Sequence, residues 1–126
     1  MSEIVKMQGL RVLVVEDEML VAMMIEDILE DLGCAVTMAG SETAGLGALE
    51  AGSFDAAVLD VNLHGETSYR VAKAAHDRSI PILFSTGYSN TRLGPPFEDH
   101  PILTKPFGED DLTLALSRLT GGAKPS

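Results

Sequence analysis

Residues 10–18 read Leu-Arg-Val-Leu-Val-Val-Glu-Asp-Glu, a run of branched apolar side chains that stops at three acids. A run of this kind is typical of a strand that is buried on both faces of a parallel sheet. Similar runs recur at residues 56–59 and 80–84, and two shorter apolar stretches occupy residues 35–39 and 102–103. The sequence therefore predicts five strands.

Helical patterns separate these strands. Apolar residues between positions 20 and 32 are spaced three or four apart and are followed by Gly33, which favours a helix end. The same period assigns Met23 and Met24, with the neighbouring Met19, to the core. The alternative is an exposed methionine-rich edge that serves a partner.

Three further segments complete the pattern. Ser41 is a favourable N-cap for a helix to about residue 51, residues 71–75 mark a third helix, and the acids at 109–111 favour the start of a closing helix. Residues 87–101 are rich in glycine and proline, so we expect a loop with at most a short helix. Strands that alternate with helices imply a parallel sheet covered on both faces.

Length and composition fit one domain. The chain has 126 residues, of which 45% are hydrophobic, and this is enough to bury a core without disulfide bonds. We expect the domain to span residues 9–120, after an N-terminal extension at 1–8 and before a flexible tail at 121–126. Cys34, the single cysteine, has no intramolecular partner and is predicted to be a small buried residue.

The charge and the apolar pattern exclude several partners. A formal net charge of -10 opposes binding to nucleic acid phosphates. No apolar run approaches the roughly 20 residues that a membrane-spanning helix needs, and the N-terminus has no secretory signal pattern. We therefore expect a soluble, cytoplasmic protein that contacts neither nucleic acid nor a membrane.

Polar side chains follow the predicted strands at the edge of the sheet where the carboxyl ends meet. Glu16 and Asp17 follow the first strand, Asp60 the third, Thr86 the fourth and Lys105 the fifth. Converging carboxylates repel one another, and a hard divalent cation, best Mg²⁺, would neutralise them. Lys105 and Thr86 can then stabilise phosphoryl oxygens, which predicts an acyl phosphate on Asp60.

Each of these residues, taken alone, has a simpler explanation. Helix caps, turns and solvated surface charges use the same residue types. Their joint position at matching ends of four strands favours a site over these separate explanations.

Four segments resemble the signature segments of bacterial response-regulator receiver domains: Val14-Val15-Glu16-Asp17-Glu18, Val58-Leu59-Asp60-Val61-Asn62-Leu63, Phe84-Ser85-Thr86-Gly87 and Thr104-Lys105-Pro106-Phe107. The resemblance covers nearly the whole chain and implies a three-layer, flavodoxin-like, doubly wound (βα)5 fold with strand order 2-1-3-4-5.

The resemblance also implies roles for the site residues. It implies phosphorylation of Asp60, and Mg²⁺ ligation by Glu16, Asp17, Asp60 and the backbone carbonyl of Asn62. Thr86 and Lys105 match the hydroxyl and the lysine that contact the phosphoryl group. The bond between Lys105 and Pro106 resembles one that the family holds cis.

The chain departs from the family pattern in two places. Ile102 stands where most receivers carry a Tyr or Phe that follows the hydroxyl on phosphorylation, and residues 87–101 replace a regular fourth helix. The segment from Phe84 to Gly87 resembles a subgroup of single-domain receivers with Phe-Ala-Thr-Gly, except that Ser85 replaces the alanine. We hypothesise that Tyr88 takes over part of the signalling role, and we expect Gly87 to leave the site open.

The resemblance implies a single-domain response regulator. It would accept a phosphoryl group from a sensor histidine kinase or a phosphotransfer protein and signal through an unknown protein target, as a monomer or weak dimer. An aspartate-nucleophile phosphatase usually carries a second Asp where this chain has Asn62, so we do not expect an enzyme. Two alternatives stay open, a binding module that is never phosphorylated and a phosphate sink. The three histidines are too dispersed for a metal cluster, although His64 is a candidate for lining the pocket.

Overall fold

The computed structural model describes residues 7–63, 65–88 and 90–122, so the prediction for His64 lies outside the described residues. Five strands form one parallel sheet in the order β2-β1-β3-β6-β7, which confirms the predicted order 2-1-3-4-5. The strands are β1 (Arg11–Val15), β2 (Ala35–Ala39), β3 (Ala56–Asp60), β6 (Ile82–Thr86) and β7 (Ile102–Thr104). A small antiparallel hairpin that the sequence did not predict, β4 (Asn62–Leu63) with β5 (Glu66–Thr67), follows β3.

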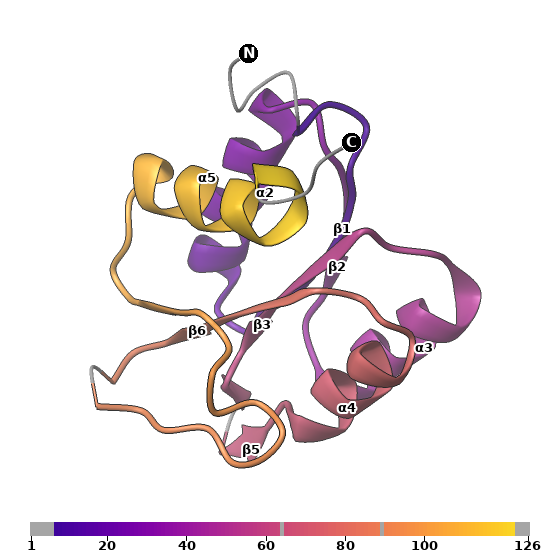
Figure 1. Cartoon of the computed structure of the whole chain (residues 1–126), viewed down its shortest axis with the longest axis vertical. Helices are drawn as coiled ribbons and strands as arrows, with labels where there is room; N and C mark the ends of the chain where they lie inside the picture. Colours follow the sequence, from indigo (N-terminus) through magenta and orange to yellow (C-terminus); the bar gives the residue numbers. More distant parts are fainter. Residues whose placement is uncertain (1–6, 64, 89, 123–126) are drawn as a thin grey trace.

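Helices cover both faces of this sheet. Figure 1 shows α2 and α5 together on one side and α3 and α4 together on the other. Their bounds are α2 (Met19–Asp31), α3 (Glu42–Ala51), α4 (Tyr69–Asp77) and α5 (Glu109–Ser117), and α5 continues into a π-helical turn, η1 (Arg118–Gly122). The structure is therefore the predicted three-layer α/β architecture.

The core consists of two clusters, one on each face of the sheet. Along β1, Val12 and Val14 pack with residues of α2 and α5, whereas Leu13 and Val15 pack with residues of α3 and α4. Successive side chains of a strand point to opposite faces, so a strand covered on both faces must be apolar throughout. This alternation explains why residues 12–15 are continuously apolar.

Local signals set several boundaries as expected. Ser41 caps α3, because its hydroxyl accepts a hydrogen bond of 3.1 Å from the Ala44 N–H. Gly33 follows α2 with a φ of 89°, a conformation that glycine adopts without strain. Cys34 is buried, as predicted. Met7 is also buried, so the predicted N-terminal extension contributes to the core at its first described residue.

The first turns of α2 contradict the assignment of Met19, Met23 and Met24 to the core and agree with the alternative of an exposed methionine-rich edge. Met19, Leu20, Met23 and Met24 are exposed, with relative accessibilities from 36% to 81%. The buried residues of this helix are Ile25, Ile28 and Leu29. The apolar period of the sequence therefore extends beyond the part of the helix that packs on the sheet.

The connection between β6 and β7 has no helix among its described residues, 87–88 and 90–101, in agreement with the expected irregular segment. Leu93 and Phe97 anchor it in the core, and the Pro95–Pro96 peptide bond is cis. The ring of Phe97 packs edge-on against Tyr69 and Phe84 at centroid distances of 5.6 and 5.5 Å. The loop is thus held by two buried side chains instead of by helical packing.

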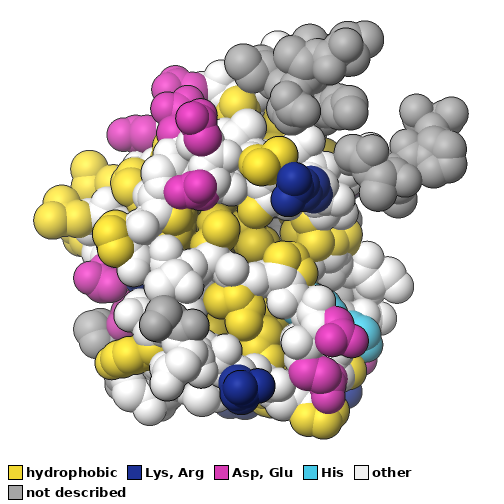
Figure 2. Space-filling model, turned by 60° about the vertical axis from the view of Figure 1, so that its left-hand side comes forward, with side chains coloured by type: hydrophobic (Ala, Val, Ile, Leu, Met, Phe, Trp, Pro, Cys, Tyr) yellow, Lys and Arg dark blue, Asp and Glu magenta, His cyan; other side chains and the backbone are white. Residues whose placement is uncertain are grey.

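The outer surface reflects the composition. On the face drawn in Figure 2, Asp and Glu side chains predominate over Lys and Arg, consistent with a net charge of -10. None of the helices in the described ranges is both long and apolar enough to cross a bilayer.

Candidate functional site

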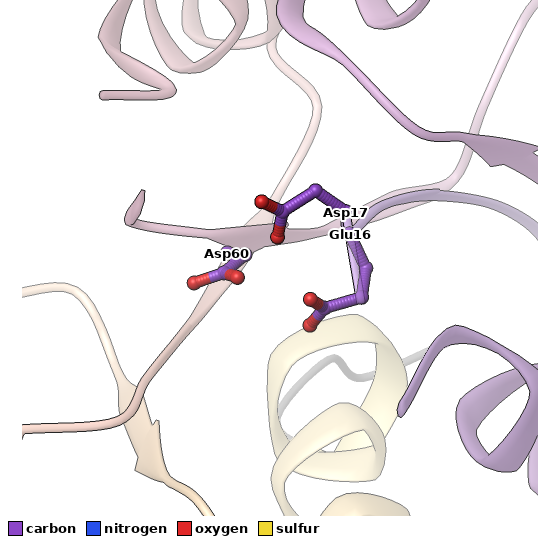
Figure 3. Close-up of side chains that lie close together, drawn as sticks. All are labelled: Glu16, Asp17 and Asp60. Carbon is purple, nitrogen blue, oxygen red and sulfur yellow. The ribbon is translucent and has the colours of Figure 1, made fainter. Parts of the chain in front are cut away.

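Three carboxylates converge at the carboxyl edge of the sheet. Glu16 and Asp17 follow β1, and Asp60 is the last residue of β3, which pairs with β1. One oxygen atom of each lies within 4.8 Å of the others, and Figure 3 shows the three side chains around a common space. Glu16 and Asp60 are only 3% and 4% exposed, so two of the negative charges are shielded from water.

Lys105 brings a positive charge into this group. Its Nζ lies 2.8 Å from Glu16 Oε1, 3.0 Å from Asp60 Oδ2 and 3.3 Å from Glu18 Oε1. The backbone N–H of Lys105 donates a 2.7 Å hydrogen bond to the Thr86 carbonyl, which holds Lys105 in place. The peptide bond between Lys105 and Pro106 is cis, as expected. Glu18 was not singled out from the sequence, although it belongs to the acidic triplet that ends the first apolar run.

Burial and contacts between charges both shift the pKa values in this group. Burial raises the pKa of Glu16 to about 7, because the contact with Lys105 only partly compensates for the loss of solvent. Burial acts in the opposite sense on Lys105, yet the carboxylates of Glu16 and Asp60 outweigh it and hold the pKa of Lys105 above its ordinary value. One ammonium group therefore faces more negative charge than it balances.

This donor set fits a hard divalent cation. Carboxylate oxygens are the ligands that Mg²⁺ prefers. Among the described residues, Glu16 Oε1 accepts no well-directed hydrogen bond even though Lys105 Nζ is close. A cation beside the three acids would lower their mutual repulsion, which favours binding.

An open cleft of about 390 Å³ gives access to the acids. Asp60 Oδ1 accepts a 3.2 Å hydrogen bond from the Asn62 N–H, while Oδ2 contacts Lys105. The residues that line the cleft are Asp17, Glu18, Asp60, Asn62, Gly87, Tyr88 and Lys105. Four predicted site residues therefore share one cleft, and Glu16 lies buried beside it.

Thr86 lies differently from the other predicted site residues. It is 1% exposed and does not line the cleft. Its hydroxyl contacts the hydroxyl of Thr91 at 2.8 Å and accepts a 3.2 Å hydrogen bond from the Tyr88 N–H. Thr91 was missed in the sequence, because a single hydroxyl in an irregular segment carries no periodic or motif signal.

Comparisons with known proteins agree with this geometry. A family model described as the response regulator receiver domain matches residues 12–117. The transcriptional regulatory protein DltR of Streptococcus agalactiae is 35% identical over 115 residues, which are 87% of this chain and 51% of that protein. The chain spans about half the length of DltR and of the transcriptional regulatory protein TcrA of Mycobacterium tuberculosis, which is 31% identical over 120 residues.

Two solved structures match this chain over almost their full length. The solution structure of SdrG from Sphingomonas melonis Fr1 is 42% identical with a TM-score of 0.78, and the match covers 94% of this chain and 98% of SdrG. The receiver domain of the sensor histidine kinase PA1611 from Pseudomonas aeruginosa PAO1, which has a magnesium ion coordinated in its active site cleft, is 26% identical with a TM-score of 0.78. That match covers 90% of this chain and 98% of the PA1611 domain.

The family match extends from β1 to the end of α5 and includes all three acids and Lys105. Receiver domains of two-component systems are phosphoacceptor signalling domains for which Mg²⁺ binding is standard. This chain belongs to the response regulator receiver domain family.

Proposed function

We propose that this domain accepts a phosphoryl group from a histidine kinase or a phosphotransfer protein onto Asp60 and signals through protein contacts that depend on this modification. The observation that carries the proposal is the position of Asp60. It lies within 4.8 Å of two further acids, 3.0 Å from Lys105 Nζ, and in the wall of an open cleft.

Glu16, Asp17 and Asp60, with the backbone carbonyl of Asn62, are the residues that would hold Mg²⁺, which neutralises charge on phosphoryl oxygens. An oxygen of Asp60 forms a bond to phosphorus while the P–N bond of the donor phosphohistidine breaks. The electron pair of that bond goes to the imidazole nitrogen, which takes up a proton. Lys105 stabilises the charge on the transferred group, because its raised pKa keeps it protonated.

The same geometry argues against catalytic turnover of external phosphate esters. A phosphatase of this type needs an acid to protonate the leaving alcohol, and the side-chain amide of Asn62 cannot serve as one. The complete set of acids and lysine also favours phosphorylation over a module that only binds partners. A phosphate sink would use the same site, and only partner assays separate it from a signalling domain.

We further propose that the domain spans residues 9–120, acts in the cytoplasm, and is a monomer or a weak dimer. Its similarity to SdrG over 94% of this chain and 98% of that chain supports the proposed bounds of the domain. Its target would be another protein.

Phosphorylation is tested by intact-protein mass spectrometry after incubation with acetyl phosphate and Mg²⁺. We expect one phosphoryl increment on the wild type and none on Asp60→Asn or after chelation of Mg²⁺. Asp55→Asn is the matched control, because Asp55 is an aspartate bound to Arg11 at a distance from the cleft. An increment on Asp60→Asn, or none on the wild type with any phosphohistidine donor, would contradict the proposal.

A further inference from the structure

A chain of hydrogen bonds leads from Thr86 into the loop that follows β6. Thr86 Oγ1 lies 2.8 Å from Thr91 Oγ1, and Thr91 Oγ1 donates a 2.8 Å hydrogen bond to the Tyr88 carbonyl. The Tyr88 N–H donates in turn to Thr86 Oγ1 at 3.2 Å. The backbone N–H of Thr91 also donates to the Tyr88 carbonyl, so residues 88 and 91 are joined twice.

Counting protons fixes the direction of the central bond. A threonine hydroxyl has one proton, and that of Thr91 is used on the Tyr88 carbonyl. The 2.8 Å contact between the two hydroxyls is therefore a hydrogen bond only if Thr86 donates and Thr91 accepts. In the unphosphorylated domain the Thr86 proton is directed at Thr91.

After phosphorylation, the hydroxyl proton of Thr86 is needed for a different hydrogen bond. Under the proposed function, Thr86 donates a hydrogen bond to an oxygen of the phosphoryl group on Asp60. Thr86 has no second proton, and its side chain does not line the cleft in this structure. The bond to Thr91 must break before Thr86 can contact the phosphoryl group.

Thr91 is well placed to pass this change on. Leu93, two residues further along, and Phe97 are buried in the core, so the loop is fixed beyond Thr91. Tyr88, which is hydrogen-bonded to both threonines, is 64% exposed. A change in the bond between Thr86 and Thr91 therefore acts on a short turn between the phosphoryl site and the anchored loop.

We propose that Thr91 is a positioning residue that holds the Thr86 hydroxyl away from the phosphoryl site until Asp60 is phosphorylated, and whose release from Thr86 then changes the surface around Tyr88. This inference rests on the proposed function. The hydrogen bonds of Thr91 would connect the site to the surface in a chain where Ile102 occupies the usual position of the Tyr or Phe that follows the hydroxyl.

The test measures binding of beryllofluoride, a stand-in for the phosphoryl group, in the presence of Mg²⁺. Binding is followed by ¹H–¹⁵N NMR of the backbone amides. Thr91→Val keeps the side-chain shape but removes the acceptor, so we expect beryllofluoride to bind about 2- to 10-fold more tightly, the equivalent of one neutral hydrogen bond. Thr91→Ser keeps the hydroxyl and should bind like the wild type.

A second set of variants distinguishes loss of the bond between Thr86 and Thr91 from a general effect of the substitution on the loop. In a Thr86→Ala background, Thr91→Val should leave the beryllofluoride affinity unchanged, because the bond is already missing. The Tyr88 amide of unliganded Thr91→Val should also shift toward its position in the beryllofluoride complex of the wild type.

The outcomes distinguish the inference from the proposed function. Equal affinity of the wild type and Thr91→Val, or the same gain in the Thr86→Ala background, would overturn the role of Thr91 while leaving phosphorylation of Asp60 intact. Wild type that does not bind beryllofluoride with Mg²⁺, or Asp60→Asn that binds it equally, would overturn both.

Discussion

Glu16 directly follows β1 and Asp60 ends the neighbouring β3, whereas Thr86 ends β6 and leads into residues 87–101, where the described chain forms turns and no helix. The first two side chains are joined through Lys105 by contacts of 2.8 and 3.0 Å, and we call these three residues with Asp17 the acidic half of the site. Thr86 is instead joined to Tyr88 and Thr91, which we call the hydroxyl half.

The two halves differ in what fixes them. Paired strands and ionic contacts place the acidic half before any ligand binds, which suits a site for chemistry. The backbone of Thr86 is paired in β6, but its hydroxyl is held only by hydrogen bonds with Tyr88 and Thr91. Each such bond contributes only about 1 kcal/mol, so ligand binding can rearrange them. The comparison predicts that changes in one half leave the other largely intact.

The largest effect is expected from the anchor of the loop. Phe97 is 2% exposed, and Phe97→Ala should lower the free energy of unfolding by about 3 to 5 kcal/mol, as for other buried aromatic residues. The measurement is urea denaturation. Leu20→Ala is the control, because Leu20 is 81% exposed and its truncation should cost less than about 0.5 kcal/mol. Similar losses for both would show that the loop is not anchored by Phe97.

The next largest effect is expected when the positive charge of Lys105 is removed from the acidic half. Lys105→Met leaves the carboxylates of Glu16 and Asp60 without the lysine between them, and we expect the free energy of unfolding to fall by about 2 kcal/mol in the absence of Mg²⁺. This is less than for a fully buried pair, because Glu16 can take up a proton. Lys73→Met removes the same charge from an exposed pair with Asp77 and should cost less than about 0.5 kcal/mol. Equal costs in urea denaturation would contradict the account of the acidic half.

Mg²⁺ should stabilise the folded domain through the same acids. At about ten times its dissociation constant, a cation that binds only the folded state adds about 1.4 kcal/mol. Thermal unfolding with and without a chelator should therefore show a Mg²⁺-dependent increase in Tm for the wild type and for Asp27→Asn, an exposed acid on α2. Asp17→Asn should lose the increase, and an unchanged increase in this variant would remove Asp17 from the metal site.

The smallest effect concerns Ser85, which lies between the two halves and pairs with Asp60 across the sheet. Its hydroxyl is buried and has no hydrogen-bond partner among the described residues. Ser85→Ala should raise the free energy of unfolding by about 1 kcal/mol, because an unpaired polar group is removed. Ser41→Ala, which removes a helix cap, should instead lower it by about 1 kcal/mol. A loss of stability in Ser85→Ala would show that its hydroxyl is satisfied in solution.

The sequence predicted that the acids and Lys105 converge and that Thr86 ends a strand, but it did not predict the contact of Thr86 with Thr91. Glu16 and Asp17 follow one strand and Asp60 ends the next, and parallel strands bring their carboxyl ends to one edge of the sheet. The bond between Thr86 and Thr91 depends on the path of an irregular loop, which no periodicity describes. The burial of the first turns of α2 was predicted wrongly for a related reason. An apolar period identifies one face of a helix but not how much of its length is covered by the rest of the protein.

The most direct test of the central claim is the chemical identity of the modified residue. After treatment with acetyl phosphate and Mg²⁺, hydroxylamine cleaves an acyl phosphate and leaves a hydroxamate on the former acceptor, which peptide mass spectrometry locates. We predict loss of the phosphoryl increment with a hydroxamate at Asp60. An increment that survives hydroxylamine, or a hydroxamate that maps to another carboxylate, would contradict the account.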